Sequence, residues 1–560
     1  MGPLSCKPVV SNKATGSACL LLLMLALIAS ASATDVVTYH NDNARTGQNL
    51  NETTLTYSNV NSASFGKLFT MPVDGIIDAE PLYLSGLTIA GSTHNVLYAV
   101  TENDSVFAFD ADEGTLLWQV SLLLTGETPS DDLGCTFISP QIGITSTPVI
   151  DRGSGPHGTI YVVAMSKNGT TYYQRIHALD VTTGQEEFGG PVTITGKYPG
   201  TGDDSLNGFA IFEPRQYAER QGLLLLNGII YTGWTSHCDE LPYTGWVIGY
   251  SESTLKQTSV LNLTPNGSGG AIWQSGAGMA SDGESIYFLD GNGTFDTTLN
   301  AQGFPISGDF GNGFLRVSTT DNQLQVADYF EAYNTVAESA VDDEIGSGGA
   351  LVLPPMVDST GTTRYLAIGA GKDSNIYIVD RTNLGKFNPN NDSAIYQELD
   401  GALVHGIWSM PAYYEGSVYF GSRENYLLQF QFSKALLSTT ASSRSAAIFE
   451  IPGTTPSVSA SGPTNGIVWA IEHSDPIDVL HAYEASSLAK ELYNSNQASA
   501  GRDQFGQATH FGTPMIVNGM VYVGTTTNVT AFGLLAGQNG PNHKKALGAN
   551  STNVKALGSH

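Results

Sequence analysis

Histidines in separate stretches of the chain are the side chains best suited to move protons near neutral pH, and two cations could stabilise negative charge beside them. Imidazole titrates close to neutrality, so each histidine could act as a general acid or base. Any one of them taken alone could equally have a structural role. The candidate catalytic residues are His237, Arg215, Lys372, His405 and His510.

A second set of polar and aromatic residues could hold a ligand next to these groups. Tryptophans beside titratable side chains suit an organic molecule with an extended π-system or several oxygens. We expect substrate binding by Glu80, Trp273, Gln274, Asp343, Trp408, Arg423, His473 and Asp503. The same group of loop positions includes Thr145, Arg220, Asp239, Asn292, Asp296 and Glu472.

The sequence lacks the motifs of several familiar catalysts. It contains no HExxH, paired CxxC, GxSxG or Walker-loop motif, so zinc hydrolysis, α/β-hydrolase chemistry and nucleotide hydrolysis have no support. The acidic triplet at 342–344 could supply oxygens to Ca²⁺, although such a triplet is more often a solvated loop. We therefore expect no metal site.

An internal repeat indicates the scaffold that must position these residues. The stretch Asn95–Val120 alternates apolar residues with turn residues and predicts three short strands in a meander. The run at 177–188 aligns on 107–118 without a gap, so that Asp110, Gly114 and Trp118 correspond to Asp180, Gly184 and Phe188. Self-similarity at a period of about 50 residues is typical of a β-propeller.

The pattern predicts an all-β fold, an eight-bladed β-propeller closed by an N-terminal strand. The last unit has only three strands, and Phe65–Asp74 is the natural donor of the fourth, which would remove the open edge. The expected domains are an N-terminal arm at 34–64, the propeller at 65–535 and a disordered tail at 536–560. The loops at one face of this ring would bring the candidate residues together.

The charge of the chain argues against two classes of partner. The net charge is −28, with only 24 Lys and Arg residues. Nucleic-acid affinity comes mainly from neutralised phosphates, so a nucleic-acid partner is not expected, and an anionic membrane surface is disfavoured for the same reason. A small-molecule substrate is the expected partner.

The N-terminus predicts export. Lys7 and Lys13 precede the apolar run Cys19–Ser30, and an Ala-Ser-Ala sequence at 31–33 fits a signal-peptidase site. We therefore expect residues 1–33 to be a signal peptide and the mature chain to be secreted, with no membrane span after cleavage.

Export leaves two cysteines in the mature chain, Cys135 and Cys238. In an oxidising compartment a disulfide between them is favoured over two free thiols, and their places in neighbouring repeats put both on the same face of the fold. Sequons predict glycosylation at Asn51, Asn103, Asn168, Asn262, Asn266, Asn292, Asn391 and Asn528, with a further sequon at Asn550.

With the strand at 65–74, the repeat at 107–118 and the run Gly371–Gly385 in view, the chain resembles the quinoprotein alcohol dehydrogenase-like superfamily. The resemblance implies an eight-bladed propeller, in which members of that family hold pyrroloquinoline quinone (PQQ) and Ca²⁺. The chain is also similar to secreted PQQ-like propellers of undefined chemistry, through the runs Tyr39–Asn49, Gly143–Asp151, Ser236–Trp246, Ile272–Gly278 and Gly291–Asp296.

Departures from the family pattern argue against its chemistry. Lys372 lies where the family places a cation facing the quinone, but it could equally be part of an ordinary Gly-Lys-Asp turn. The vicinal cysteine pair that covers PQQ and the W-D-x-D run that supplies the catalytic aspartate are both absent. PQQ and Ca²⁺ are therefore disfavoured, and no cofactor is expected.

Three functions remain open. The first is a non-redox enzyme of secondary metabolism, similar to fungal hetero-Diels–Alderases, in which His and Arg promote loss of water and stacking orients the partners of a cycloaddition. The second is a non-catalytic binding or scaffold propeller. The third is a PQQ-dependent dehydrogenase. The substrate, the oligomeric state and a lid role for residues 294–311 are not determined by the sequence.

Overall fold

Short strands account for nearly all of the regular structure. The computed structural model describes residues 2, 34–203 and 205–537. Within these ranges the α-helical structure is a single short helix, α1 (Thr335–Ser339). Apart from residue 2, the predicted signal peptide lies outside the described residues, as does the predicted tail beyond residue 537. No helix in the described part of the chain is long and apolar enough to cross a membrane.

Eight of the sheets formed by the described residues are antiparallel meanders of successive strands, numbered here in chain order. Meander 1 is β3 (Leu82–Ile89), β4 (Ser92–Thr101), β5 (Ser105–Asp110) and β6 (Leu116–Ser121); meander 2 is β9 (Val149–Asp151), β10 (Thr159–Asn168), β11 (Thr171–Asp180) and β12 (Val192–Thr193). Meander 3 is β17 (Leu224–Leu226), β18 (Ile229–Ser236), β19 (Trp246–Ser251) and β20 (Gln257–Asn262); meander 4 is β21 (Ala280–Ser281), β22 (Ser285–Leu289), β23 (Phe314–Ser318) and β24 (Gln325–Glu331).

The second half of the chain repeats this plan. Meander 5 is β25 (Leu351–Val352), β28 (Leu366–Ala370), β29 (Ile376–Asp380) and β31 (Gln397–Leu399); meander 6 is β32 (Ala412–Tyr414), β33 (Ser417–Gly421), β34 (Asn425–Ser433) and β36 (Ser443–Phe449). Meander 7 is β37 (Ser457–Ser461), β38 (Thr464–Glu472), β39 (Val479–Glu484) and β40 (Glu491–Asn494); meander 8 is β41 (Met515–Val517), β42 (Met520–Gly524), β43 (Asn528–Leu534) and β2 (Phe65–Pro72).

Shorter strands extend these sheets or form small ones of their own. Strands β7 (Thr128–Asp131) and β8 (Gln141–Ile142) extend meander 2, β16 (Tyr217–Ala218) pairs with β18, β30 (Lys386–Phe387) with β24, and β35 (Leu436–Leu437) with β34. The small sheets are β13 (Lys197–Pro199), β14 (Ser205–Leu206) and β15 (Phe209–Ile211), and the pair β26 (Met356–Val357) and β27 (Thr363–Arg364).

The repeat residues act as the sequence predicts. Asp110 Oδ1 accepts the backbone N–H groups of the two residues at 112 and 113, each at 2.9 Å, and Gly114 adopts a φ of 74°. Gly184, the equivalent residue in meander 2, has a φ of 69°, and a Cβ there would lie 2.9 Å from the ring of Trp118. Glycine is required because the turn needs positive φ and the neighbouring ring fills the space of a side chain.

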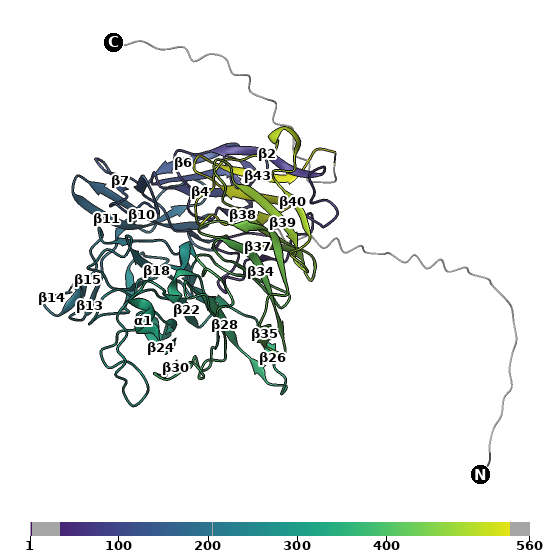
Figure 1. Cartoon of the computed structure of the whole chain (residues 1–560). Coiled ribbons are helices and arrows are strands. Elements are labelled where there is room, and N and C mark those ends of the chain that lie inside the picture. Colours follow the sequence, from purple (N-terminus) through teal and green to yellow (C-terminus); the bar gives the residue numbers. More distant parts are fainter. Residues whose placement is uncertain (1, 3–33, 204, 538–560) are drawn as a thin grey trace. The chain divides into compact units, whose positions relative to one another are not determined.

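The predicted closure by an N-terminal strand is confirmed. Strand β2 pairs antiparallel with β43 from Phe65 opposite Leu534 to Pro72 opposite Asn528, and Figure 1 shows these two strands side by side although they come from opposite ends of the chain. Phe65 is fully buried, with its ring 5.3 Å from Trp469 and 5.0 Å from Tyr493. Its packing joins meander 8 to meander 7.

The arm that precedes β2 touches the inner strand of every meander in turn. Its backbone accepts or exchanges hydrogen bonds with Tyr83, Ile150, Ser281, Val352, Tyr413 and Val458, and the Asn43 and Asn49 side chains donate to Leu225 O and Ile516 O. The six backbone partners lie in meanders 1, 2, 4, 5, 6 and 7, in that order. Leu225 lies in meander 3 and Ile516 in meander 8, so all eight meanders are represented. Strand β1 (Gln48–Asn49) within the arm also pairs parallel with β37. The arm therefore ties the eight inner strands to one segment.

Arg45 holds this arm in place. It is fully buried and donates hydrogen bonds to Met279 O at 3.0 Å, Thr38 Oγ1 at 2.7 Å and Leu223 O at 3.2 Å. A Cβ at Gly278 would lie 2.7 Å from the guanidinium, so glycine is needed for this close approach. Burial lowers the pKa of Arg45 to about 10, which leaves the group charged at neutral pH.

Replacement of Arg45 by alanine tests the role of the arm. The variant leaves buried carbonyl oxygens without donors, so the free energy of unfolding should fall by about 3–5 kcal/mol, the range for a broken buried charged network. Urea unfolding followed by tryptophan fluorescence measures the change. The exposed Arg444→Ala variant is the control, with an expected change below about 0.5 kcal/mol. Equal stability of Arg45→Ala and the wild type would show that the arm is dispensable.

Candidate functional site

A cavity of about 240 Å³, called here the central cavity, lies among the segments that lead into the inner strands. Its lining comprises Phe137, Arg220, Cys238, Asp239, Trp273, Ser275, Asp342, Glu344, Ser347, Lys372, Trp408 and Phe511. These residues come from meanders far apart in the sequence.

Two acidic side chains hold Lys372 at the edge of this cavity. Its Nζ lies 2.6 Å from Asp342 Oδ1 and 2.8 Å from Glu344 Oε1, and 5.8 Å from the centre of the Trp408 ring. Burial lowers the pKa of Lys372, but the attraction of Glu344 and Asp342 outweighs burial and the net pKa is raised. Burial also raises the pKa of Glu344 to about 8. The positive charge of Lys372 is therefore already compensated by the protein.

Arg220 is buried without such compensation. Its side chain is 6% exposed, and its Nε and Nη2 atoms have no hydrogen-bond partner among the described residues. The guanidinium carbon lies 4.3 Å from the centre of the Phe511 ring and 5.7 Å from that of Trp273. Burial lowers the pKa of Arg220 to about 10, so the group remains a cation at neutral pH.

A second cavity of about 670 Å³, called here the side cavity, shares Phe137 with the central one. His473 and His510 line it, with ring centres 6.2 Å apart. His473 Nδ1 lies 3.1 Å from Asp478 Oδ2, which fixes its orientation. Burial lowers the pKa of His510, so this ring is neutral near pH 7 and able to accept a proton.

Two carboxyl groups meet beside these histidines. Asp78 lines the side cavity, and burial raises its pKa while Glu102 and Thr509 act as hydrogen-bonding neighbours. Burial and the proximity of Asp78 raise the pKa of Glu102 well above its usual value. Glu102 Oε1 has no donor in the described structure, whereas Oε2 accepts Gly143 N–H at 2.6 Å. Glu102 is buried and Asp78 is partly buried, and a close pair of carboxyls of this kind disfavours ionisation of both groups.

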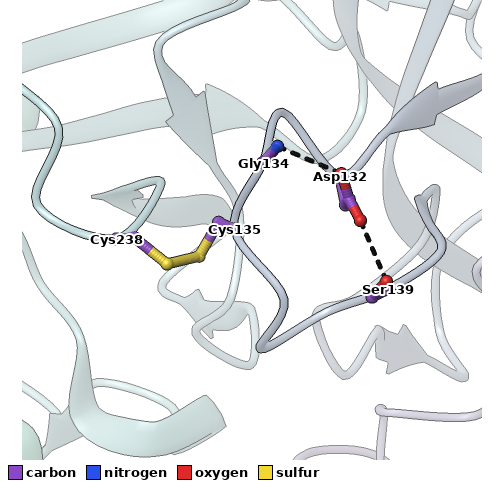
Figure 2. The surroundings of a disulfide bond; sticks show 5 residues. All are labelled: Asp132, Gly134, Cys135, Ser139 and Cys238. Carbon is purple, nitrogen blue, oxygen red and sulfur yellow. Dashed lines mark hydrogen bonds between the residues drawn. A yellow bond between two sulfur atoms is a disulfide. The ribbon is translucent and has the colours of Figure 1, made fainter.

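The predicted disulfide is confirmed. Cys135 and Cys238 are bonded, with Cα atoms 5.5 Å apart and 103 residues between them in the sequence. Figure 2 shows that Cys135 lies within a loop in which Asp132 accepts hydrogen bonds from Gly134 N–H at 3.0 Å and Ser139 Oγ at 2.9 Å. The same loop carries Phe137 between the two cavities, so the disulfide anchors a wall of both.

Several residues proposed from the sequence meet at these cavities. Trp273, Lys372 and Trp408 line the central cavity, and His473 and His510 line the side cavity.

Two other predicted residues, Arg423 and His237, lie near the central and side cavities but do not line either of them. The Arg423 guanidinium stacks on Trp408 at 4.7 Å. His237 lies in a small crevice of about 10 Å³ with Arg220 and Cys135, and burial lowers its pKa to about 4, so it is neutral at pH 7.

The remaining predicted site residues are placed elsewhere. Glu80 is buried and accepts His40 N–H at 2.7 Å, within the contacts of the arm. Gln274 is fully buried and accepts Leu289 N–H at 3.3 Å. Asp503 accepts hydrogen bonds from Arg502, Tyr493 and Lys67, next to β2; Arg215 stacks on Tyr172 at 5.6 Å; His405 and Asp343 are exposed.

The predicted glycosylation sites differ in exposure. Asn51, Asn168, Asn266 and Asn391 are exposed, and Asn103, Asn292 and Asn528 are partly buried. Asn262 is buried and donates to Thr244 Oγ1 at 2.8 Å. Asn550 lies outside the described residues.

Asp78, Glu102, Phe137 and Phe511 were not identified from the sequence. Asp78 precedes the first inner strand and Glu102 occupies the turn after the second strand of meander 1. The other candidate site residues occupy the same two kinds of loop in other meanders. An acidic residue in both loops of meander 1 is therefore the sequence signal that could have identified this pair. Their closeness depends on the turn geometry, which the sequence pattern does not determine.

No protein-family model and no curated protein matches the sequence. Solved structures do match. The quinohemoprotein alcohol dehydrogenase from Comamonas testosteroni gives a TM-score of 0.59 at 13% identity, over 93% of this chain and 83% of that one. The quinohemoprotein alcohol dehydrogenase ADHIIG from Pseudomonas putida HK5 gives 0.58 at 14% identity, over 94% and 83%. A europium-containing methanol dehydrogenase gives 0.53 at 12% identity, over 90% and 98%.

At these identities the similarity shows the fold alone. The chain has the propeller fold of PQQ-type alcohol dehydrogenases, as its resemblance to that superfamily predicted. Its site residues have to be judged from their own geometry. Among the described residues, no group of three or more His, Cys, Asp or Glu side chains is arranged to hold a metal ion.

The pH dependence of stability tests the buried state of Glu344. Its pKa of about 8 in the folded chain exceeds the ordinary value of 4.5, so the folded state keeps a proton that the unfolded state releases between these values. The free energy of unfolding should therefore fall as the pH rises from 5 to 8. Glu344→Gln should weaken this dependence, measured by urea unfolding at several pH values. The exposed Glu284→Gln variant should not, and an unchanged slope in Glu344→Gln would contradict the assignment.

Proposed function

We propose that this protein is a secreted, non-redox enzyme that binds an organic small molecule in the central cavity and acts on it by proton transfer. The observation that carries the proposal is the Asp78–Glu102 carboxyl pair, in which the pKa of both groups is raised and of which Asp78 lines the side cavity, which shares Phe137 with the central cavity. A carboxyl pair of this kind supplies an acid and a base at the same pH. The disulfide is compatible with an oxidising, extracellular compartment.

The reaction class that suits this arrangement is a dehydration followed by ring closure. The shared proton of Asp78 and Glu102 would pass to a substrate hydroxyl, and the C–O bond would break with release of water. A proton lost from the substrate elsewhere would return to the carboxylate or to neutral His510. The rings of Phe137, Trp273 and Phe511 would orient the conjugated product for cycloaddition, as in hetero-Diels–Alderase chemistry.

The residues present do not fit PQQ. The cofactor is a planar quinone bearing several carboxylates, and it would have to share the central cavity with Asp239, Asp342 and Glu344. Lys372, the cation that the family resemblance assigns to the quinone, is already engaged by two of these carboxyls. No step of the proposed reaction uses a quinone or a metal.

A second candidate function is ligand binding without turnover. A groove of about 920 Å³ lies away from the central cavity, lined by aromatic and amide side chains that include Tyr198, Asn266, Gln302 and Phe304. Amide and aromatic side chains in an open groove suit a polar ligand such as a glycan. In this case the ligand would bind in the groove, and the carboxyl pair would have no catalytic role.

Incubation of the secreted protein with metabolite extracts, followed by mass spectrometry, tests the proposal. Turnover should be lost by at least about 100-fold in Asp78→Asn and Glu102→Gln, because each removes the shared proton, while Glu284→Gln retains activity. Native mass spectrometry after addition of PQQ and Ca²⁺ should show no stoichiometric complex. Uptake of PQQ, or turnover unaffected by both carboxyl variants, would contradict the proposal.

A further inference from the structure

Arg220 differs from the other buried arginines in having no partner for its charge. Buried Arg45 donates to several carbonyl oxygens, and Arg175 pairs with Glu127 at 2.7 Å. Arg220 forms no ion pair within 4 Å among the described residues, and its Nε and Nη2 are buried without acceptors. A buried cation left in this state is costly, so an anion that binds it would be strongly favoured.

The unpartnered atoms are those that recognise a carboxylate. Nε and Nη2 lie on the same edge of the planar guanidinium, and the two N–H groups of that edge can donate to both oxygens of one carboxylate. The indole of Trp273 lies beside the Asp239 carboxyl, whose pKa it lowers, so its N–H already faces a protein acceptor. Arg220 and Trp273 both line the central cavity.

The walls around this donor set are aromatic. The guanidinium carbon lies 4.3 Å from the centre of the Phe511 ring, and Phe137 and Trp273 line the same cavity. Flat rings of this kind pack favourably against a conjugated or aromatic ligand. The lining therefore combines a carboxylate-binding edge with surfaces for a planar body.

The charged groups near Arg220 do not form an ion pair with it. Lys372 is compensated by Asp342 and Glu344. Glu219, adjacent in sequence, is buried, and burial raises its pKa well above the usual value although the backbone N–H of Gly233 lowers it. Asp78 and Glu102 act on Arg220 from beyond ion-pair distance, and burial raises the pKa of both carboxyls. Arg220 is thus the cation that remains unpaired at this site.

We propose that the substrate is an aromatic or conjugated carboxylate, bound through its carboxylate by Arg220 in the central cavity, with its planar body against the aromatic walls. This inference rests on the proposed function, since it names the substrate class for the same site. It assigns to Arg220 a specificity role and leaves proton transfer to the Asp78–Glu102 pair.

Calorimetric titration with paired probes tests the inference. Cinnamate and benzoate should bind the wild-type protein at least about tenfold more tightly than cinnamamide and benzamide, because a charged hydrogen bond adds about 1.5–3 kcal/mol. Arg220→Gln should abolish this preference and Arg220→Lys should retain part of it, whereas the exposed Arg444→Gln should leave it unchanged. Equal binding of acids and amides, no binding of either acid at millimolar concentration, or a preference that survives Arg220→Gln would overturn the inference.

A stability measurement keeps the test independent of folding defects. Removal of an unpaired buried charge should leave the ligand-free Arg220→Met variant at least as stable as the wild type, since the new side chain is apolar and similar in length. Marked destabilisation would show that Arg220 has an internal partner. The two proposals fail separately: a neutral substrate converted equally well by Arg220→Gln refutes only the substrate class, and carboxylate binding without any turnover refutes only the catalysis.

Discussion

The hydrogen bonds between the N-terminal arm and the eight inner strands are the constraint on which the rest of the structure depends. Each inner strand offers backbone groups to the centre of the fold, and one continuous segment satisfies a group from each of them. Arg45 fixes that segment by donating to carbonyl oxygens of meanders 3 and 4. The pairing of β2 with β43 then joins the two ends of the chain, so residues from the first and last meanders become neighbours.

The site follows from this closure. Asp78 precedes meander 1 and His510 precedes meander 8. Because the two ends of the chain meet, the charge of His510 lowers the pKa of Asp78 and the charge of Asp78 raises that of His510. Burial raises the pKa of Asp78 and Glu102, and it leaves Arg220, whose pKa stays near 10, without a partner at Nε and Nη2 among the described residues. A buried cation without a partner next to carboxyls of raised pKa lowers the stability of the folded, ligand-free protein. We assign this centre a function because a bound ligand would remove that cost.

The fold could be predicted from the sequence further than the site could. The Asp110 turn, the glycine at 114 and the three-stranded last unit each have a local physical cause, and the structure confirms the strand Phe65–Pro72 as the missing partner. The disulfide followed from cysteine count and repeat position. Loop positions also identified Trp273 and Trp408, but not the Asp78–Glu102 contact, because loop conformation decides which side chains meet. Glu80 pointed into the arm for the same reason.

The most direct test of the central claim is a neutron crystal structure of the deuterium-exchanged protein at neutral pH. We expect one deuteron between the carboxyl groups of Asp78 and Glu102, a fully deuterated Arg220 guanidinium, and no protein acceptor on Arg220 Nε or Nη2. A pair of deuteron-free carboxylates, or a protein carboxylate bound to Arg220, would contradict the account, since the site would then have neither the retained proton nor the unpaired cation.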